Sequence, residues 1–193
     1  NEFIHWQRNL RWMDIKVFGD GLIEHYKKHL DETERSIFHS KERFTKEYAV
    51  LQKELHAKGN YGTSGIELIP TIFHSMAQMA KKHGEVSVLD YGSSNGSTIE
   101  AVREKMWIPP GVTDFCYDPF VEKYSQEPVP ADLVLCIDGM EHVETQCISA
   151  VLDHLQSLTK HLIFFCIALT PATKELSDGR NAHISLRDSE KWL

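Results

Sequence analysis

The stretch Val88-Leu-Asp-Tyr-Gly-Ser-Ser-Asn-Gly-Ser-Thr98 runs from apolar residues into an acid and then into a short loop with two glycines. The apolar residues before Asp90 predict a buried strand, and residues 97–106 predict the helix that follows. Gly92 and Gly96 let the backbone turn sharply and approach a ligand closely, because they carry no Cβ atom. The stretch therefore predicts an α/β fold with a nucleotide-binding strand, turn and helix.

Asp90 indicates which kind of ligand this turn can bind. A dinucleotide fingerprint has the pattern G-x-G-x-x-G and seats a pyrophosphate on the helix N-terminus. Here only G-x-x-x-G is present, and a carboxylate stands where it would repel a phosphate. We therefore expect a cationic ligand rather than an anionic one.

Two later stretches repeat the pattern of a strand that ends in an acid. Val112-Thr-Asp-Phe-Cys-Tyr-Asp118 predicts a second strand whose last acid lies roughly 20 residues beyond the glycine loop, where an Asp or Glu can bind ribose hydroxyls. Asp132-Leu-Val-Leu-Cys-Ile-Asp-Gly-Met-Glu-His-Val143 predicts another apolar strand that runs into a polar turn. Parallel strands bring their carboxyl ends to one edge of the sheet, so these acids are expected to lie together.

In this order, the stretches resemble motif I and the later D-x-x-E-H-V strand of the class I S-adenosylmethionine-dependent methyltransferases, and the resemblance covers residues 61–193. It implies a doubly wound, mostly parallel, Rossmann-like sheet with S-adenosylmethionine as cofactor. The implied cofactor-binding residues are Tyr61, Thr63, Asp90, Gly92, Ser93, Ser94, Gly96, Asp118, Pro119, Phe120 and Asp138. For Tyr61 and Thr63, a glycine turn with a helix N-cap explains the pattern equally well.

The chain departs from this family in two places. Only about a dozen residues separate Asp118 from the strand at 133–137, too few for a full helix, strand and helix, so the third strand is expected to be reduced or missing. After the strand at 161–169 and a polar loop, a helix begins at 185, and the last two strands of the family are not found. Residues 15–18 form a short strand pattern that could fill an edge of the sheet.

The resemblance also implies which atoms carry the chemistry. No Asn-Pro-Pro-Tyr or Asp-Pro-Pro-Tyr sequence follows the strand at 133–137, which disfavours methylation of a base amino group and favours an oxygen acceptor. His142 is the general-base candidate, with His183 as its expected neighbour. Asp138, Glu141, His142 and His183 together resemble the ligands of metal-dependent O-methyltransferases, which implies Mg²⁺ or Mn²⁺. In a simpler alternative, the acid caps a helix and the histidine packs near the cofactor.

The first 59 residues predict a helical N-terminal extension, and residues 60–193 predict the cofactor-binding domain. Apolar residues from 3 to 13 follow helical spacing, and those from 22 to 55 recur at threes, fours and sevens. A further helix is expected over 66–82. The 22–55 seam is expected either to pack on the domain or to serve as a homodimer seam or substrate lid.

Composition narrows the class of protein further. The net charge of −7 and the dispersed basic residues disfavour a protein that mainly grips nucleic acid. No apolar run is long enough to cross a membrane, and the four cysteines form no C-x-x-C pair, which favours reduced thiols and a cytoplasmic location. The expected partner is a small-molecule acceptor. The alternatives are a methyltransferase acting on nucleic acid or protein and a non-catalytic binding module. The other histidines, including His56 and His154, are interpreted as surface or satellite-core residues.

Overall fold

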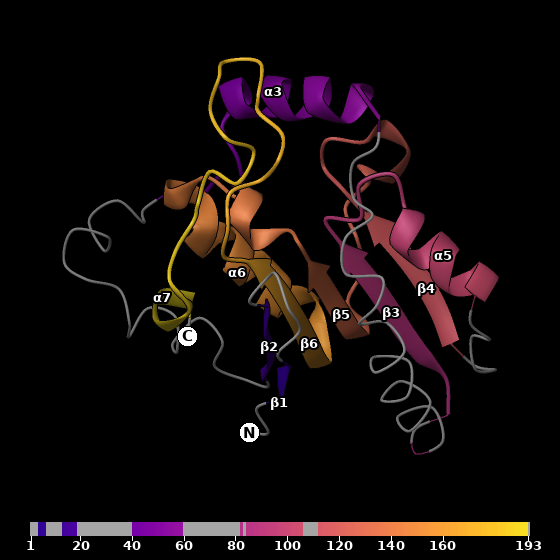
Figure 1. The fold of residues 1–193 in the computed structure, drawn as a ribbon. Coiled ribbons are helices and arrows are strands. Elements are labelled where there is room, and N and C mark those ends of the chain that lie inside the picture. Colours follow the sequence, from indigo (N-terminus) through magenta and orange to yellow (C-terminus); the bar gives the residue numbers. More distant parts are fainter. Residues whose placement is uncertain are drawn as a thin grey trace.

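The computed structural model describes residues 4–6, 13–18, 40–59, 82, 84–105 and 112–192. Its centre is a parallel sheet of four strands: β3 (Val86–Tyr91), β4 (Val112–Tyr117), β5 (Ala131–Ile137) and β6 (Thr159–Ala168) (Figure 1). Their spatial order is β6-β5-β3-β4, so β3 pairs with both β4 and β5. The expected α/β fold with a mostly parallel sheet is confirmed at this level.

The strand order creates a switch point in the sheet. The chain moves from β3 to β4 on one side and then returns past β3 to form β5 on the other. In open α/β sheets, ligands bind outside the carboxyl ends of the strands at such a reversal, because the connections diverge there and leave a crevice. Here β3, β4 and β5 end next to Gly92, Asp118 and Asp138.

The reduced third strand is confirmed, because residues 118–130 contain only a short 3-10 turn, η2 (Glu122–Tyr124), and no strand. This connection is too short to hold a helix and a strand. β4 is consequently an edge strand of the described sheet, and the side chain of Phe115 is exposed on it.

Two strands from the N-terminal segment complete the opposite edge. β2 (Met13–Phe18) pairs antiparallel with β6, and β1 (Ile4–Trp6) pairs antiparallel with β2. Residues 15–18, for which the sequence offered an edge position only as a minor possibility, do pair with β6, whereas the helix expected from the spacing of residues 3–13 is wrong at residues 4–6 and at Met13. β6 carries an almost continuous apolar run, and pairing with β2 covers backbone groups that would otherwise stand unpaired at its edge. Local spacing could not reveal this tertiary partner.

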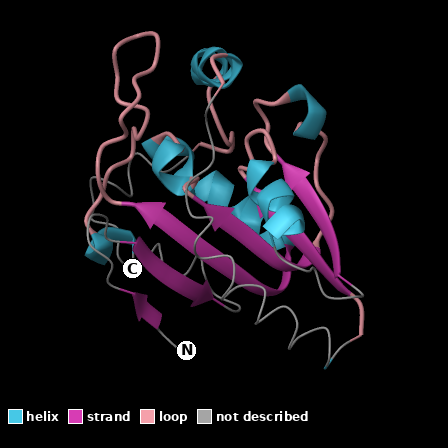
Figure 2. Ribbon diagram, turned by 45° about the vertical axis from the view of Figure 1, so that its right-hand side comes forward, coloured by secondary structure: helices cyan, strands magenta, loops and turns pink. Residues whose placement is uncertain are grey.

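The helices cover the sheet and its loops. They are α5 (Ser97–Lys105), α6 (Ile148–Leu158) and the short α7 (Ser189–Trp192), with 3-10 turns η3 (Met140–His142) and η4 (Thr145–Cys147) before α6. Buried residues of α6 recur at positions 148, 151, 152 and 155, which is the apolar stripe that its sequence predicts. These side chains join the main core with Leu89, Val134 and Phe165. Figure 2 shows the helices, in cyan, beside the strands of the sheet, in magenta.

Helix α3 (Lys46–Ala57) lies across the carboxyl ends of the strands (Figure 1). Thr45 caps its N-terminus, because the threonine side chain accepts a hydrogen bond from the amide of Tyr48. Tyr48 and Leu55 are buried in a second cluster with Leu176, Ala182 and neighbouring apolar side chains. The expected apolar seam is therefore buried at Tyr48 and Leu55 and partly buried at Phe44 and Leu51, while its part from 22 to 39 lies outside the described residues.

Two further expectations can be compared with the described residues. All four cysteines are free thiols, three of them buried. Among the described residues, no helix is long and apolar enough to cross a membrane. The helix expected over 66–82 falls almost entirely outside the described residues, as do Tyr61 and Thr63.

Candidate functional site

A pocket of about 680 Å³, including the part open to solvent, lies at the switch point of the sheet. Its floor is formed by residues at the carboxyl ends of β3, β4 and β5, and its roof comes from α3 and the residues before it. The lining comprises Arg43, Phe44, Tyr48, Gln52, His56, Tyr91, Gly92, Tyr117, Asp118, Pro119, Phe120, Cys136, Asp138, Gly139, Met140, His142, Val143 and Val151. The predicted residues Gly92, Asp118, Pro119, Phe120, Asp138 and His142 thus share one pocket.

The glycine loop after β3 is shaped by the end of β4. The amides of Gly92 and Ser93 both donate to the carbonyl of Tyr117, at 2.8 and 3.0 Å. The amide of Ser94 donates to Asp118 Oδ2 at 2.9 Å. Among the predicted cofactor residues, Ser93, Ser94 and Gly96 are buried and do not line the pocket. They build the loop that carries Gly92.

Gly96 is required by both its conformation and its surroundings. Its φ of +80° is one that side-chain-bearing residues rarely adopt, and a Cβ at this position would come within 2.5 Å of the Tyr124 hydroxyl. Gly179 has a similar φ of +86° but nothing within 4 Å of the same point. Substitutions at the two glycines can therefore distinguish the cost of the backbone conformation, which both share, from the cost of the steric conflict, which only Gly96 has.

We expect Gly96→Ala to lower the free energy of unfolding more than Gly179→Ala does. Both variants incur the left-handed backbone cost of about 1–2 kcal/mol. Gly96→Ala must also displace Tyr124, and we expect about 1 kcal/mol more from this overpacking. Denaturant unfolding measures both losses. Adding Tyr124→Ala should remove the excess, and equal losses in the two glycine variants would contradict the role of Tyr124.

Strained backbone borders the pocket at two residues other than glycine. Ser94 has a φ of 51° and Asp138 a φ of 47°, both in the left-handed region. Each is fixed by a hydrogen bond from its own amide, Ser94 to Asp118 and Asp138 to the carbonyl of Cys166 at 2.7 Å. Such residues cost of order 1–3 kcal/mol and concentrate at functional sites. Their position at the ends of β3 and β5 agrees with a ligand site at this edge.

Asp118 is held rigidly at the end of β4. Its two carboxylate oxygens accept hydrogen bonds from the amides of Ser94 and Phe120, each at 2.9 Å, and Oδ2 lies 3.9 Å from His56 Nε2. Burial raises the pKa of this carboxyl, while the amides and His56 act in the opposite direction. Each oxygen can accept more than one hydrogen bond, so Asp118 can still bind ligand hydroxyls.

Asp90 lies beneath the loop and does not line the pocket. Its side chain is 3% exposed, and its Oδ2 has no hydrogen-bond partner among the described residues. Burial, with a smaller effect of nearby Asp118, raises the pKa of Asp90 to about 7. A positive charge near the glycine loop would favour the ionised form of this carboxyl. Asp90 therefore makes the loop more receptive to a cation.

His142 and His183 converge as expected. Their ring centroids are 4.8 Å apart, although His142 follows β5 and His183 follows β6 in a loop 41 positions later. His142 Nδ1 lies 2.8 Å from the carbonyl of Ala182, and His183 Nδ1 lies 2.6 Å from the carbonyl of Thr170. A carbonyl only accepts, so each Nδ1 carries the hydrogen and the neutral ring keeps its lone pair on Nε2.

Glu141 completes a group of three residues that could hold a metal ion. One potential ligand atom from each of Glu141, His142 and His183 lies within 4.8 Å of the others. Glu141 is fully buried; its Oε1 accepts from the amide of Ala168 at 3.0 Å, and its Oε2 has no hydrogen-bond partner among the described residues. Burial and then nearby Asp138 raise the pKa of Glu141 to about 8.

Asp138, the fourth expected ligand, does not belong to this described group. Its Oδ1 accepts a long contact from the Cys166 thiol at 3.7 Å, and Asp138 lines the pocket. The described group thus offers two imidazoles and one carboxylate, and the participation of Asp138 as a fourth ligand stays a prediction.

Several pocket residues were missed from the sequence. Tyr48, Gln52 and His56 repeat at intervals of four on α3, so they form one stripe facing the pocket. His56, interpreted from the sequence as a surface or satellite-core residue, packs near Phe120 at the second cluster and also lines the pocket beside Asp118. Polar side chains inside an otherwise apolar helical stripe were the available signal.

Comparison of this chain with protein-family models, curated proteins and solved structures finds no match. The functional assignment therefore depends on the residues of the site.

Proposed function

We propose that the protein is an S-adenosylmethionine-dependent methyltransferase with a doubly wound, Rossmann-like core, which transfers a methyl group to an oxygen of a small-molecule or sugar-type acceptor. The observation that carries the proposal is the pocket at the switch point, where Gly92 and the rigid carboxylate of Asp118 lie in the same cavity as His142. A close backbone approach, a hydroxyl-binding acid and a proton-accepting group are what this reaction needs from a protein.

The charges of the site support a cationic cofactor. Asp118 and Asp138 line the pocket, and Asp90 lies beneath the adjoining loop. Three carboxyl groups would repel a pyrophosphate but attract a sulfonium or an ammonium group. We infer that Asp118 accepts hydrogen bonds from the two ribose hydroxyls, because its carboxylate lines the pocket and each oxygen can accept a further hydrogen bond. These features argue for an adenosyl sulfonium over a dinucleotide.

Methyl transfer demands alignment more than elaborate catalysis. The methyl group of a sulfonium is already activated; it passes to the acceptor oxygen as the carbon–sulfur bond breaks, and the acceptor loses its hydroxyl proton. His142 Nε2 is the lone-pair atom placed to receive that proton. Burial, followed by the influence of His183, lowers the pKa of His142 to about 3, so the ring is neutral at physiological pH. A neutral ring is the form that can bind a metal or accept a proton. Because a base with so low a pKa is weak, transfer to His142 requires an acceptor hydroxyl that is more acidic than an ordinary alcohol.

In an alternative version of the mechanism, Glu141, His142 and His183 hold a divalent ion, and His142 Nε2 is then a metal ligand and not the proton acceptor. The buried Glu141 Oε2 lacks a partner among the described residues, and both imidazoles keep Nε2 as a ligand atom. The carbonyls that accept from Nδ1 are the usual orienting partners of metal-binding histidines. Two nitrogens and one oxygen favour Mn²⁺ over Mg²⁺, the other ion expected from the sequence. A bound ion would orient the acceptor oxygen and make its hydroxyl more acidic.

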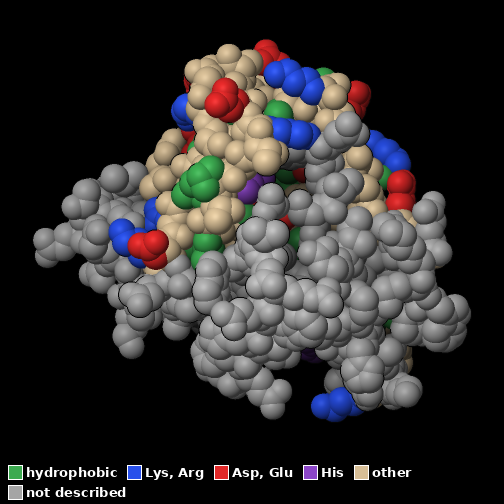
Figure 3. All heavy atoms as spheres, viewed as in Figure 1, with side chains coloured by type: hydrophobic (Ala, Val, Ile, Leu, Met, Phe, Trp, Pro, Cys, Tyr) green, Lys and Arg blue, Asp and Glu red, His purple; other side chains and the backbone are tan. Residues whose placement is uncertain are grey.

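The surface supports a small acceptor over a nucleic acid. Lys and Arg side chains are interspersed with Asp and Glu over the described part of the face in Figure 3. Arg180, one of the residues that a nucleic-acid site would need, is paired with Asp178, and Arg187 lies over the Trp192 ring. Neither arginine joins a continuous basic surface in the described part of the chain.

Asp118 provides the direct test of cofactor binding. We expect Asp118→Ala to weaken binding of S-adenosylhomocysteine, measured by calorimetry, by about 1.5–3 kcal/mol, the scale for hydrogen bonds to a charged group. The matched control is Asp114→Ala on the same strand, whose partner is Arg103 on the surface. An unchanged affinity in Asp118→Ala would contradict the assignment. Failure of the wild-type protein to bind would contradict the proposed function.

A further inference from the structure

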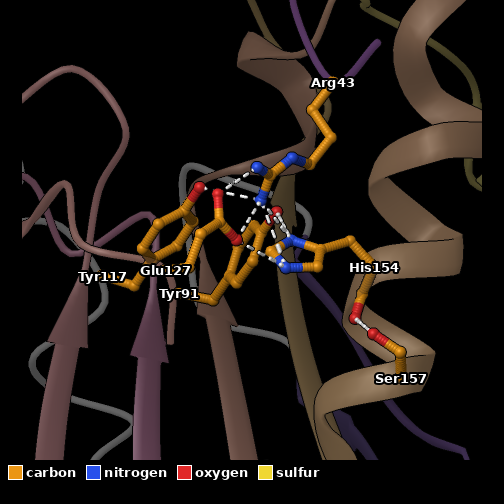
Figure 4. A network of polar contacts seen from close by, with 6 residues as sticks. All are labelled: Arg43, Tyr91, Tyr117, Glu127, His154 and Ser157. Atoms are coloured by element: carbon orange, nitrogen blue, oxygen red, sulfur yellow. Dashed lines mark hydrogen bonds and ion pairs between the residues drawn. The ribbon is translucent and has the colours of Figure 1, made fainter. Parts of the chain in front are cut away.

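Arg43 is the centre of a polar network at one wall of the pocket (Figure 4). Its Nη1 donates to the Tyr117 hydroxyl at 2.9 Å and lies 2.7 Å from His154 Nδ1. The guanidinium carbon is 5.8 Å from the centre of the Tyr117 ring. Tyr91 extends the network, because its hydroxyl lies 2.9 Å from His154 Nδ1. Three side chains of the folded core thus hold one guanidinium in place.

Glu127 is the partner on the outer side of this guanidinium. Nη1 donates to Glu127 Oε2 at 3.2 Å, and Nη2 donates to the other oxygen, so the carboxylate meets both terminal nitrogens of the fork. The Glu127 side chain is 63% exposed on the loop between β4 and β5, whereas that of Arg43 is 26% exposed. Glu127 Oε2 also lies 3.4 Å from His154 Nε2. Because solvent screens the exposed Glu127 carboxylate, a carboxylate or phosphate of a ligand can replace it at the guanidinium.

The location of Arg43 adds a charge that the rest of the pocket lacks. Among the described residues that line the pocket, Arg43 is the permanently charged cation, and Asp118 and Asp138 are acids. A guanidinium recognises carboxylates and phosphates through two parallel hydrogen bonds. Glu127 already demonstrates that this fork accepts a carboxylate while Tyr117 and His154 keep the arginine in position.

We propose that Arg43 is the anion-binding residue of the pocket and takes a carboxylate or phosphate group of the ligand in exchange for Glu127. The ligand is then a molecule with an anionic end at Arg43 and with hydroxyl or cationic groups toward Asp118. The anionic group belongs either to the amino-acid part of the cofactor or to the acceptor. The choice of ligand depends on the proposed methyltransferase function, but the anion site itself can be tested without it.

The first experiment compares Arg43→Met with the wild-type protein at fixed ionic strength. Calorimetry uses S-adenosylhomocysteine and 5′-methylthioadenosine, which lacks the amino-acid part, and thermal unfolding uses inorganic phosphate. If the cofactor supplies the anion, Arg43→Met weakens S-adenosylhomocysteine binding about 10- to 100-fold and leaves 5′-methylthioadenosine unchanged. If the acceptor supplies it, both adenosyl ligands bind unchanged, and phosphate stabilises the wild-type protein but not the variant. Arg103→Met is the control for loss of a surface arginine.

The variant Glu127→Gln is expected to change ligand affinity in the direction opposite to Arg43→Met. Glu127 competes with the ligand anion, so its neutralisation should tighten binding of the responsive ligand about two- to fivefold. If the Arg43–Glu127 pair served only to hold the pocket wall together, the same change would weaken binding. Glu122→Gln, an exposed acid in the same loop, is the matched control.

Three results would overturn the proposal: equal weakening of both adenosyl ligands by Arg43→Met, weaker binding in Glu127→Gln, or the absence of any Arg43-dependent response to the three ligands. If S-adenosylhomocysteine does not bind the wild-type protein at all, the proposed function fails, and the phosphate response then tests the anion site by itself.

Discussion

Replacing His142 with alanine is expected to lower turnover by about 10²- to 10⁴-fold, the usual contribution of a positioned proton acceptor. The acceptor hydroxyl needs an atom with a lone pair close by, and the hydrogen bond from Nδ1 to Ala182 leaves that lone pair on Nε2. Release of S-adenosylhomocysteine from S-adenosylmethionine, measured with a panel of catechols, sugars and nucleosides, provides the readout. Cofactor affinity should change little, because Asp118 and the glycine loop remain intact.

Two controls separate catalysis from folding in this experiment. His161→Ala removes a largely exposed histidine of β6, far along the strand from its carboxyl end, and should leave turnover unchanged. The melting temperature of His142→Ala reports any loss from the contact with Ala182. If turnover falls only in proportion to a loss of folded protein, or does not fall at all, His142 is not the proton acceptor.

If His142 Nε2 instead holds a metal ion together with Glu141 and His183, loss of one of these ligands is expected to lower turnover about as much as loss of a proton acceptor would. Glu141→Gln and His183→Ala should each weaken Mn²⁺ binding by at least about 100-fold, since even partners of the ligands contribute 10- to 100-fold. The electron paramagnetic resonance signal of free Mn²⁺ measures binding of the ion independently of activity. Chelation by EDTA should abolish turnover in the wild-type protein, and Mn²⁺ should restore it better than Mg²⁺ because two of the three ligands are imidazoles.

The variants distinguish a metal site from a metal-free one. Asp138→Asn should keep Mn²⁺ affinity, because Asp138 does not belong to the described group of three ligands. If Glu141→Gln and His183→Ala bind Mn²⁺ as the wild-type protein does, the metal hypothesis fails. His142 then remains as a proton acceptor without a metal, and activity should persist in EDTA.

The parallel sheet could be predicted because its signals are local. Each apolar run that ends in an acid or a glycine became a strand with its polar end at one edge, as at Asp90, Asp118 and Asp138. The convergence of His142 and His183 was predictable for the same reason, since both follow the carboxyl ends of adjacent parallel strands. In a parallel sheet, residues that directly follow the strands lie at the same edge, so their positions in the sequence indicate which of them come close together.

The strands of the N-terminal segment could not be predicted from local sequence patterns. Residues 3–13 satisfy a helical spacing, yet residues 4–6 and 13–18 are strands, because β6 offers an apolar edge that needs a partner. This pairing joins residues far apart in the sequence, such as Ile15 and Cys166, which are 151 positions apart, and no short window of sequence contains both partners. Tertiary hydrogen bonding then outweighs local preference.

The sequence by itself determined the α/β class, the glycine loop and the edge of the sheet where the acids gather, because hydrophobic period and backbone freedom are properties of short segments. Only the tertiary structure decided that α3 covers the pocket with Tyr48, Gln52 and His56, and that Asp138 is not among the three residues whose potential ligand atoms lie within 4.8 Å of one another. It alone brought Arg43 to Tyr117, Glu127 and His154, residues more than 70 positions away. Side-chain direction and long-range contact depend on how the whole chain packs, and neither is encoded in the spacing of neighbouring residues.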